Sequence, residues 1–320
     1  MTDRGSLVLG VLCGAVAGAL WGLVFLAPEL ARAFGPLELT IGRYLAYGLI
    51  SAALIAPRWR SLAPMLGSGE WRALGWLALL GNTLYYILLA GSVQLGGAAV
   101  TALVIGFLPV LVTIAGSRAR DAVPLARLAP SLLLCVAGAA CIGGQALFLP
   151  STRPAGAQLA GLLCAIGALA SWGAYAVYNN HLLARLKTIS SHDWSLLTGI
   201  ATGAQSVLLI PLALLLGARS HGAGDWALLA AVSAGVAVFA SILGNALWNR
   251  MSRLLPLTLS GQMITFETLF ALLYVFAWEH RGPTALEALA FVLVVASVVT
   301  CVAAHRRPGP SFAPRPRPSS

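Results

Sequence analysis

Residues 10–25 read GVLCGAVAGALWGLVF, and residues 161–176 read GLLCAIGALASWGAYA. Seven of the 16 aligned positions are identical, among them a cysteine and the Trp-Gly pairs that begin at Trp21 and Trp172. Shared composition explains some of the Ala, Leu and Gly matches, but the aligned Cys and Trp are harder to obtain by chance. The two stretches therefore indicate an internal duplication.

The composition of the chain points to lipid as its solvent. The 320 residues are 59% hydrophobic and 9% charged, whereas a soluble domain has about 25% charged residues. The 34 glycines and 17 prolines also fit membrane helices, in which both residue types are better tolerated than in soluble helices. This composition excludes an ordinary soluble domain and predicts an all-α integral membrane protein.

Apolar runs of about 20 residues, the length that a helix needs to cross the hydrocarbon core, occur ten times. They cover residues 6–27, 37–56, 70–91, 96–116, 125–148, 158–180, 191–217, 226–249, 256–278 and 284–304. The duplication divides these runs into two five-helix repeats, residues 1–149 and 150–305. A Pro/Arg-rich tail over residues 306–320 is expected to be disordered and cytoplasmic.

The odd number of spans in each repeat predicts that the second copy enters the membrane from the opposite face. Inverted repeats of this kind characterise secondary transporters, whose substrate site lies near the midplane between the halves. A duplicated scaffold without transport is the alternative.

The formal net charge of +10 is explained by topology. With the N-terminus in the cytoplasm, the inside segments hold 15 Arg and Lys residues and the outside loops hold four. This positive-inside bias places both termini in the cytoplasm and argues against a nucleic-acid partner. There is no GxxxxGK[ST] string, which argues against a P-loop ATPase, and the five cysteines lie in apolar runs without CxxC spacing. We therefore expect no cofactor, metal site or disulfide.

Several strings, in this order along the chain, resemble the drug/metabolite transporter superfamily, and in particular its ten-helix members built from two EamA-type repeats. They are the two Trp-Gly pairs, IGRYLAYG (residues 41–48), GFLPVLVTIAG (106–116) and LSGQMITFETLFALLYVFAWEH (259–280). Within this superfamily, SWGAYAVYNN (171–180) and GNALWNR (244–250) are similar to stretches of the YddG aromatic amino acid exporters. The chain departs from the family pattern where Phe-Glu-Thr (266–268) replaces a Glu-Pro pair, and at Arg120, a place that is often acidic. The resemblance implies a multi-pass transporter of a bacterial inner membrane.

Two charged residues fall well inside predicted spans, away from the span ends, where a charge costs about 2.5 to 3.5 kcal/mol on insertion scales. Arg43 is a candidate for pairing with a substrate carboxylate through its planar fork of donors, or a packing anchor bonded to helix carbonyls or water. Glu267 is a candidate proton carrier because desolvation disfavours its charged form. Its alternatives are a neutral helix cap and a salt-bridge partner.

Aromatic and amide side chains that share helix faces supply the other substrate-pathway candidates. Aromatic walls with a few amides suit an amphipathic solute, although the same aromatics also serve to pack helices together. These candidates are Trp21, Asn82, Tyr85, Tyr86, Trp172, Tyr175, Asn179, Asn245, Trp248 and Gln262. Glycines at every fourth position of residues 10–22 favour close helix packing within the bundle over dimerisation.

The function expected from these features is alternating-access transport of amino acids, aromatic and other amphipathic ones, or of related metabolites, with export as the expected direction. A drug- or nucleoside-type metabolite transporter of the same superfamily is the nearest alternative. A membrane enzyme acting on lipid or prenyl substrates would need paired acidic motifs or a His/Ser/Asp cluster, so we expect no enzymatic activity. A channel or scaffold is the third alternative. The expected partners are a small-molecule substrate and the lipid bilayer, with proton coupling and oligomeric state left open.

Overall fold

The computed structural model describes residues 4–31, 33–96, 101, 104–118, 122–147, 154–186, 188–216, 221–278, 280 and 282–306. Within these ranges the chain is helical throughout and contains no strand. The tail residues 307–320 lie outside them. So do nine of the cations in the charge count: Arg32, Arg120, Arg153, Lys187, Arg219, Arg281, Arg307, Arg315 and Arg317.

The elements that the structure describes in the first half of the chain are all helical. Its elements are α1 (Arg4–Gly22), η1 (Leu23–Phe25), α2 (Ala27–Leu30), α3 (Pro36–Ile55), η2 (Ala56–Arg58), α4 (Trp59–Leu62), η3 (Ala63–Met65), α5 (Ser68–Ala78), η4 (Leu79–Thr83), α6 (Leu84–Gly96), α8 (Leu108–Gly116) and α9 (Leu125–Leu147).

The second half follows the same order. Its elements are α10 (Ala155–Arg185), α11 (Ser191–Leu215), α12 (Ala223–Val236), η5 (Ala237–Gly244), α13 (Asn245–Leu254), α14 (Leu257–Met263), α15 (Thr265–Trp278) and α16 (Ala285–Arg306).

Seven of the described helices are long and apolar enough to cross a membrane, and they begin at Gly5, Pro36, Ser68, Ala155, Ser191, Ala223 and Ala285. A shorter apolar helix, Leu125–Cys141, covers the fifth predicted span. The fourth and ninth predicted spans contain shorter segments: α8 in the fourth, and α14 and α15, which are separated at Ile264, in the ninth. The total of ten spans and the side on which the termini lie stay predictions.

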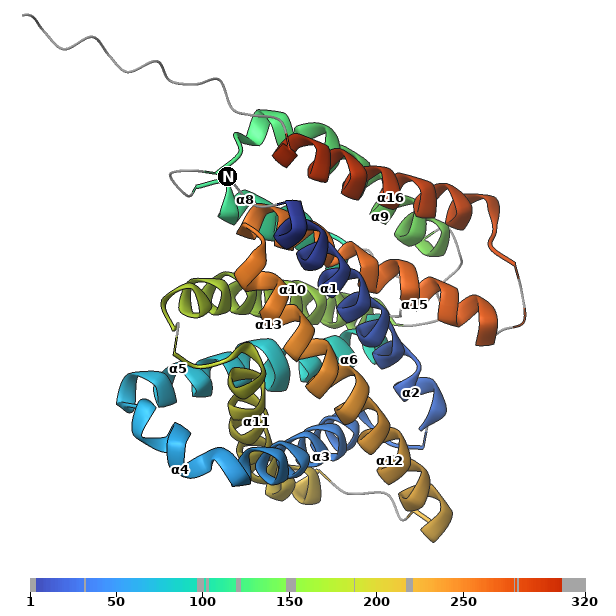
Figure 1. The fold of residues 1–320 in the computed structure, drawn as a ribbon. Coiled ribbons are helices and arrows are strands. Elements are labelled where there is room, and N and C mark those ends of the chain that lie inside the picture. Colours follow the sequence, from blue (N-terminus) through green and yellow to red (C-terminus); the bar gives the residue numbers. More distant parts are fainter. Residues whose placement is uncertain are drawn as a thin grey trace, which may run out of the picture.

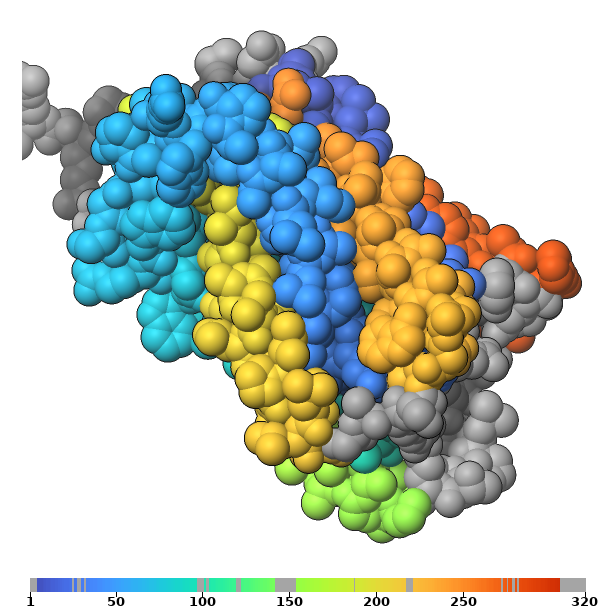
Figure 2. Space-filling view, turned by 90° about the horizontal axis from the view of Figure 1, so that it is seen from below, coloured from blue at the N-terminus to red at the C-terminus, as the bar shows by residue number. Residues whose placement is uncertain are grey.

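Contacts between the two halves come in matched sets (Figure 1). Helices α3, α8 and α9 pack against α11, α14 and α16, which occupy the same places in the second half. Other contacts come as exchanged pairs, since α6 packs on α10 while α13 packs on α1. Figure 2 shows α11, α3 and α12 side by side on one face. A two-fold relation between the halves predicts this pattern, because helices that pack on their own counterparts must lie on the axis.

The glycine stripe of α1 is used for packing inside the chain. A Cβ atom on Gly14 would lie 2.7 Å from Met251 Sδ, and one on Gly18 would lie 2.8 Å from the backbone nitrogen of Glu267. Glycine at these positions lets α1 approach α13 and α15 closely. The preference for packing within the bundle over dimerisation is therefore confirmed for these two positions.

Two spans are interrupted by π-helical segments at corresponding places. The segment η4 separates α5 from α6 in the third span, and η5 separates α12 from α13 in the eighth. A π-helical turn is rare and often accompanies a functional site, because it rotates the side chains that follow and frees backbone carbonyls. Both segments lie next to the cavity described below.

Candidate functional site

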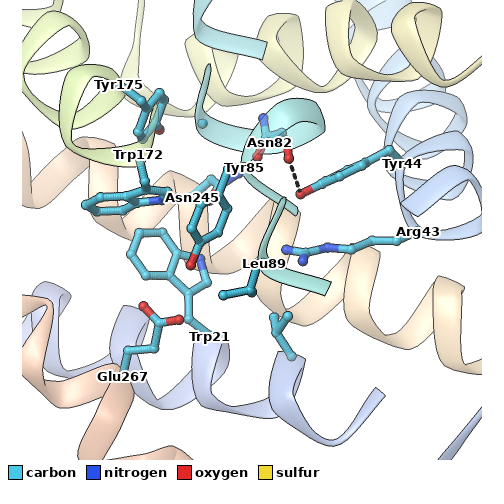
Figure 3. A pocket seen from close by; sticks show the side chains of 12 residues that line it. Trp21, Arg43, Tyr44, Asn82, Tyr85, Leu89, Trp172, Tyr175, Asn245 and Glu267 are labelled. Atoms are coloured by element: carbon cyan, nitrogen blue, oxygen red, sulfur yellow. Dashed lines mark hydrogen bonds between the residues drawn. The ribbon is translucent and has the colours of Figure 1, made fainter. Parts of the chain in front are cut away.

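A polar and aromatic cavity lies between helices of both halves (Figure 3). The space in it that is open to a water molecule is about 30 Å³. Eight of the twelve predicted pathway residues line it: Trp21, Arg43, Asn82, Tyr85, Trp172, Tyr175, Asn245 and Glu267. Val24, Tyr44, Gly81 and Leu89 complete the lining and were not among the candidates taken from the sequence.

Arg43 is held in the cavity wall by hydroxyl and aromatic groups. Its Nε donates a hydrogen bond of 3.2 Å to Ser241 Oγ, and its guanidinium carbon lies 4.9 Å and 4.8 Å from the ring centroids of Tyr44 and Tyr86. Cation–π contacts of this kind stabilise a desolvated cation by about 0.5 to 2 kcal/mol. The side chain is 9% exposed. These contacts place Tyr86 behind Arg43, one layer away from the cavity.

Arg43 has no carboxylate partner in the described part of the chain. The ion pairs between described side chains are Arg58–Asp193 at 2.9 Å and His221–Glu38 at 3.6 Å. A buried cation is normally paired, because burying an unpaired charge is costly. The wall of the cavity therefore offers a positive charge that an anionic group of a ligand can pair with.

Glu267 lies at the break in the ninth predicted span. It belongs to the first turn of α15, and its backbone nitrogen donates to the carbonyl of Ile264 at 3.0 Å. In Figure 3 its carboxyl group and the Tyr85 hydroxyl point into the same part of the cavity, while Arg43 enters from the other side. Discontinuous helices whose ends meet at a central cavity are a recurring way to build a site at membrane depth.

Three tryptophans form the aromatic wall. The rings of Trp21 and Trp172, which align in the internal repeat, meet edge to face with centroids 5.9 Å apart. Trp248 packs against both, at 5.1 Å and 5.3 Å, and supports the wall from behind without lining the cavity. The rings of Tyr85 and Tyr175 lie 6.4 Å and 5.6 Å from that of Trp172 and extend the wall on the other side. An apolar or aromatic group of a ligand would stack on this surface.

The π-helical segments position both lining asparagines: Asn82 lies in η4, and Asn245 is the first residue of α13, directly after η5. Residues 79–86 read LLGNTLYY and residues 242–249 read ILGNALWN, so Asn82 and Asn245 follow Gly81 and Gly244 at matching places. A Cβ atom on Gly81 would overlap the ring of Tyr175, and one on Gly244 would lie 2.8 Å from Trp21 Nε1. This second match between the halves went unnoticed in the sequence, and it would have singled out both glycines.

The carbonyl groups of the π-helical segments accept hydrogen bonds from the neighbouring helices. Trp21 Nε1 donates to the carbonyl of Ala240 in η5 at 3.0 Å. Ser171 Oγ donates to the carbonyl of Leu80 in η4 at 2.7 Å. These bonds attach α1 to η5 and α10 to η4, which fixes the aromatic wall beside Asn82 and Asn245.

A layer of hydrogen bonds joins helices on one side of the cavity. Asn179 Nδ2 donates to Asn249 Oδ1 at 2.8 Å, and Trp194 Nε1 donates to Asn179 Oδ1 at 3.1 Å. Tyr47 hydroxyl donates to the Ser195 carbonyl at 2.6 Å. Asn179 thus lies in this layer, where it joins α10, α11 and α13, and not in the cavity lining.

Gln262 lies away from the cavity and connects three helices. Its Nε2 donates to Thr113 Oγ1 at 3.3 Å, and its Oε1 accepts from Ser297 Oγ at 2.9 Å. The side chain is fully buried. Its described contacts join α14 to α8 and α16, so they are those of a packing residue.

Comparisons with known proteins identify the family of the chain. Residues 8–144 and 159–303 each match the EamA-like transporter family. The inner membrane protein YtfF of Escherichia coli (strain K12) is 30% identical, in an alignment that covers 93% of this chain and 96% of that protein. A solved structure described only as "Crystal structure of protein" shares the fold, with a TM-score of 0.73 and 19% identity over 96% of this chain and all of that one. The chain therefore belongs to the EamA-like transporter family and is a multi-pass membrane protein.

Proposed function

We propose that this protein is a secondary transporter that exports aromatic and other amphipathic amino acids by alternating access. One observation carries the proposal: a cation without a described carboxylate partner, Arg43, and a carboxyl group, Glu267, line one cavity together with an aromatic wall. A zwitterionic amino acid with an apolar side chain carries the complementary groups. Its carboxylate would pair with Arg43 and its ammonium group with Glu267, while its side chain would stack on Trp21 and Trp172.

The movement that we propose follows from the duplication. Residues 1–149 and 150–305 are taken as two inverted five-helix repeats, with ten spans and both termini in the cytoplasm, and with residues 306–320 as a disordered cytoplasmic tail. Rocking of one repeat against the other would expose the cavity first to one side and then to the other. The matched contacts between the halves support this mechanism, because symmetric halves have two equivalent packings that exchange inside for outside.

The experiment that tests the proposal is uptake into proteoliposomes that contain the purified full chain. Radiolabelled phenylalanine, tryptophan and leucine are compared with a nucleoside and a cationic drug, each in competition with the others. Saturable uptake of the aromatic amino acids, with weaker uptake or competition by the other solutes, is expected. Failure of aromatic amino acids to enter or compete would refute the proposed substrate class.

Proton coupling is tested in the same vesicles. In the proposed mechanism Glu267 binds a proton when the substrate has left and releases it when the substrate binds, so that protons and substrate cross in opposite directions. Collapse of an imposed pH gradient should therefore slow uptake in the native protein. Uptake that is unchanged by this collapse would refute the role of Glu267 as a proton carrier and would favour facilitated diffusion.

The second candidate function is transport of a nucleoside or related metabolite. The observation in its favour is the pair of asparagines, Asn82 and Asn245, beside the aromatic wall, since a nucleobase both stacks and hydrogen bonds. The panel above separates the two candidates. Uptake of the nucleoside with no competition by amino acids would favour the second.

A further inference from the structure

A long groove lies on the outside of the helix bundle, away from the central cavity. Its walls are apolar side chains of α1 and of the η5–α13 span, among them Val16, Leu20, Phe239 and Leu243. The space in it that is open to a water molecule is about 720 Å³. It is therefore larger than the central cavity and has a different chemical character.

The walls of the groove face the surroundings of the protein. Val16, Phe239 and Leu243 are 48%, 49% and 45% exposed, and all three lie within membrane-length apolar helices. In such a helix, exposed apolar side chains lie against lipid tails. An occupant of the groove thus has to be apolar along most of its length.

One end of the groove is polar and positively charged. Arg250 and Arg253 of α13 line it, together with His192 in the first turn of α11. Arg250 is exposed, and neither ion pair between described side chains involves it. The nearby carboxylate of Asp193 is paired with Arg58 at 2.9 Å, so the charge of Arg250 is left available.

Arg253 has a structural task at the same end. Its Nη2 donates to the carbonyls of Leu186 and Ile189 at 3.0 Å and 2.6 Å, which fixes the connection between α10 and α11 beside the groove. Arg250 is thus the cation whose removal tests binding without loosening this connection.

The length of the groove matches one leaflet of a bilayer. Phe239 and Arg250 are eleven residues apart, or about 16 Å along a helix at 1.5 Å per residue. Half of a hydrocarbon core of about 30 Å has nearly the same thickness. A groove that is apolar for the depth of one leaflet and cationic at its end has the dimensions and charge of a phospholipid with an anionic headgroup.

We propose that this groove binds one anionic phospholipid, with an acyl chain between α1 and α13 and the phosphate at Arg250 and His192. The hydroxyl groups of Ser190 and Ser191, which line the same end, are further donors for the phosphate oxygens. In the orientation expected from the charge bias, this end faces the cytoplasm, where a negative surface potential attracts basic residues.

The test is native mass spectrometry of the purified full chain, titrated with phosphatidylglycerol and, separately, with phosphatidylcholine. Four forms are compared: the native protein, Arg250→Gln, Arg250→Lys and the matched control Arg60→Gln, which removes an exposed cation of α4. We expect the native protein to bind phosphatidylglycerol more tightly. Arg250→Gln should weaken that binding about fivefold, as expected for about 1 kcal/mol per cation near an anionic headgroup. Arg250→Lys and Arg60→Gln should leave it within about twofold of the native value.

Three results would overturn the proposal: equal affinity of the native protein for the two lipids, the same affinity for phosphatidylglycerol in Arg250→Gln, or an equal loss in Arg60→Gln. Inorganic phosphate alone is titrated as a further probe. If it displaces phosphatidylglycerol completely, the site binds a free anion and not a lipid. A Leu243→Trp variant, which fills the apolar part of the groove, should weaken binding of both lipids, and unchanged binding would contradict the placement of the acyl chain.

Discussion

Replacement of Arg43 by glutamine tests the central claim about the cavity. In the native protein the guanidinium group donates a hydrogen bond to Ser241 and packs on the rings of Tyr44 and Tyr86. Glutamine removes the cation–π contacts, worth about 0.5 to 2 kcal/mol each, but it also removes the cost of holding an unpaired charge away from water, which is several kcal/mol. The two effects on the free energy of unfolding oppose each other, so we expect a folded variant.

The effect on substrate binding has no such compensation. A hydrogen bond to a charged group contributes about 1.5 to 3 kcal/mol, and each 1.4 kcal/mol corresponds to a factor of about ten. Arg43→Gln should therefore raise the KM for phenylalanine by about 10-fold to about 100-fold. Inhibition by phenethylamine, which has the same ring and ammonium group but no carboxylate, should change little.

The assay is initial-rate uptake into proteoliposomes, with each variant first checked for a single symmetric peak in gel filtration. Arg60→Gln, on α4 and away from the cavity, is the matched loss of one cation. An unchanged KM for phenylalanine in a folded Arg43→Gln protein would refute the proposed pairing. Equal weakening of phenylalanine and phenethylamine would show that Arg43 acts only as an anchor of the wall.

Three further predictions concern the coupling and the packing of the helices. Glu267→Gln should abolish uptake driven by a pH gradient but retain exchange of labelled for unlabelled substrate, measured in the same vesicles; retained gradient-driven uptake would contradict the prediction. Trp21→Phe should lower the free energy of unfolding by about 1 kcal/mol more than Trp248→Phe in a detergent thermal-stability assay, because the indole of Trp21 donates a hydrogen bond and that of Trp248 has no described partner. Gly48→Ala should lower the free energy of unfolding by about 1 to 3 kcal/mol in that assay, because its Cβ atom would lie 2.7 Å from a glycine Cα of α11. The control Gly235→Ala has open space around it and should be neutral or stabilising. Equal effects of the two substitutions would refute the close crossing of α3 and α11.

The helical character of the chain and its family could be predicted from the sequence, because both rest on features that survive without coordinates. A membrane helix is recognised in the sequence as an apolar run of about 20 residues. A duplication is visible where uncommon residues align with their own kind, as Cys13 does with Cys164. The family assignment from short strings is confirmed by the match over both halves of the chain. The boundaries of the two repeats, 1–149 and 150–305, stay a prediction.

The sequence predicted most residues of the candidate site but not how far along each helix the cavity extends. Helical spacing placed Asn179 on the face of Trp172 and Tyr175, yet its amide is bonded to Asn249 and Trp194 outside the cavity. Spacing along one helix gives a shared face, but it does not say how far along that face the cavity extends. Tyr44 was missed for a related reason. It directly follows Arg43 in α3, and helical spacing does not predict that two consecutive residues line the same cavity.

The π-helical segments could not be predicted from hydropathy, because hydropathy identifies an apolar run but not the pattern of backbone hydrogen bonds within it. Their effect is nevertheless decisive for the site, since η4 carries Asn82 and Asn245 directly follows η5. The signal that was available is the repeated Gly-Asn pair. Each of the two glycines has no side chain and so leaves room for an aromatic ring of the opposite half. Comparison of the two halves position by position, and not only of their first spans, would have found it.

The symmetry of the cavity walls contrasts with the asymmetry of its charges. Trp21 and Trp172 come as a pair from the two halves, but Arg43 does not, since alignment through the glycines where α3 crosses α11 matches it with Thr198. Glu267 is likewise single, because α8, which corresponds to the α14–α15 region, carries no acidic residue. In the proposed mechanism the paired walls allow the two halves to exchange packings, whereas the single charges can hold a zwitterion in only one direction. The duplication thus supplies the movement, and the departures from it supply the recognition of substrate.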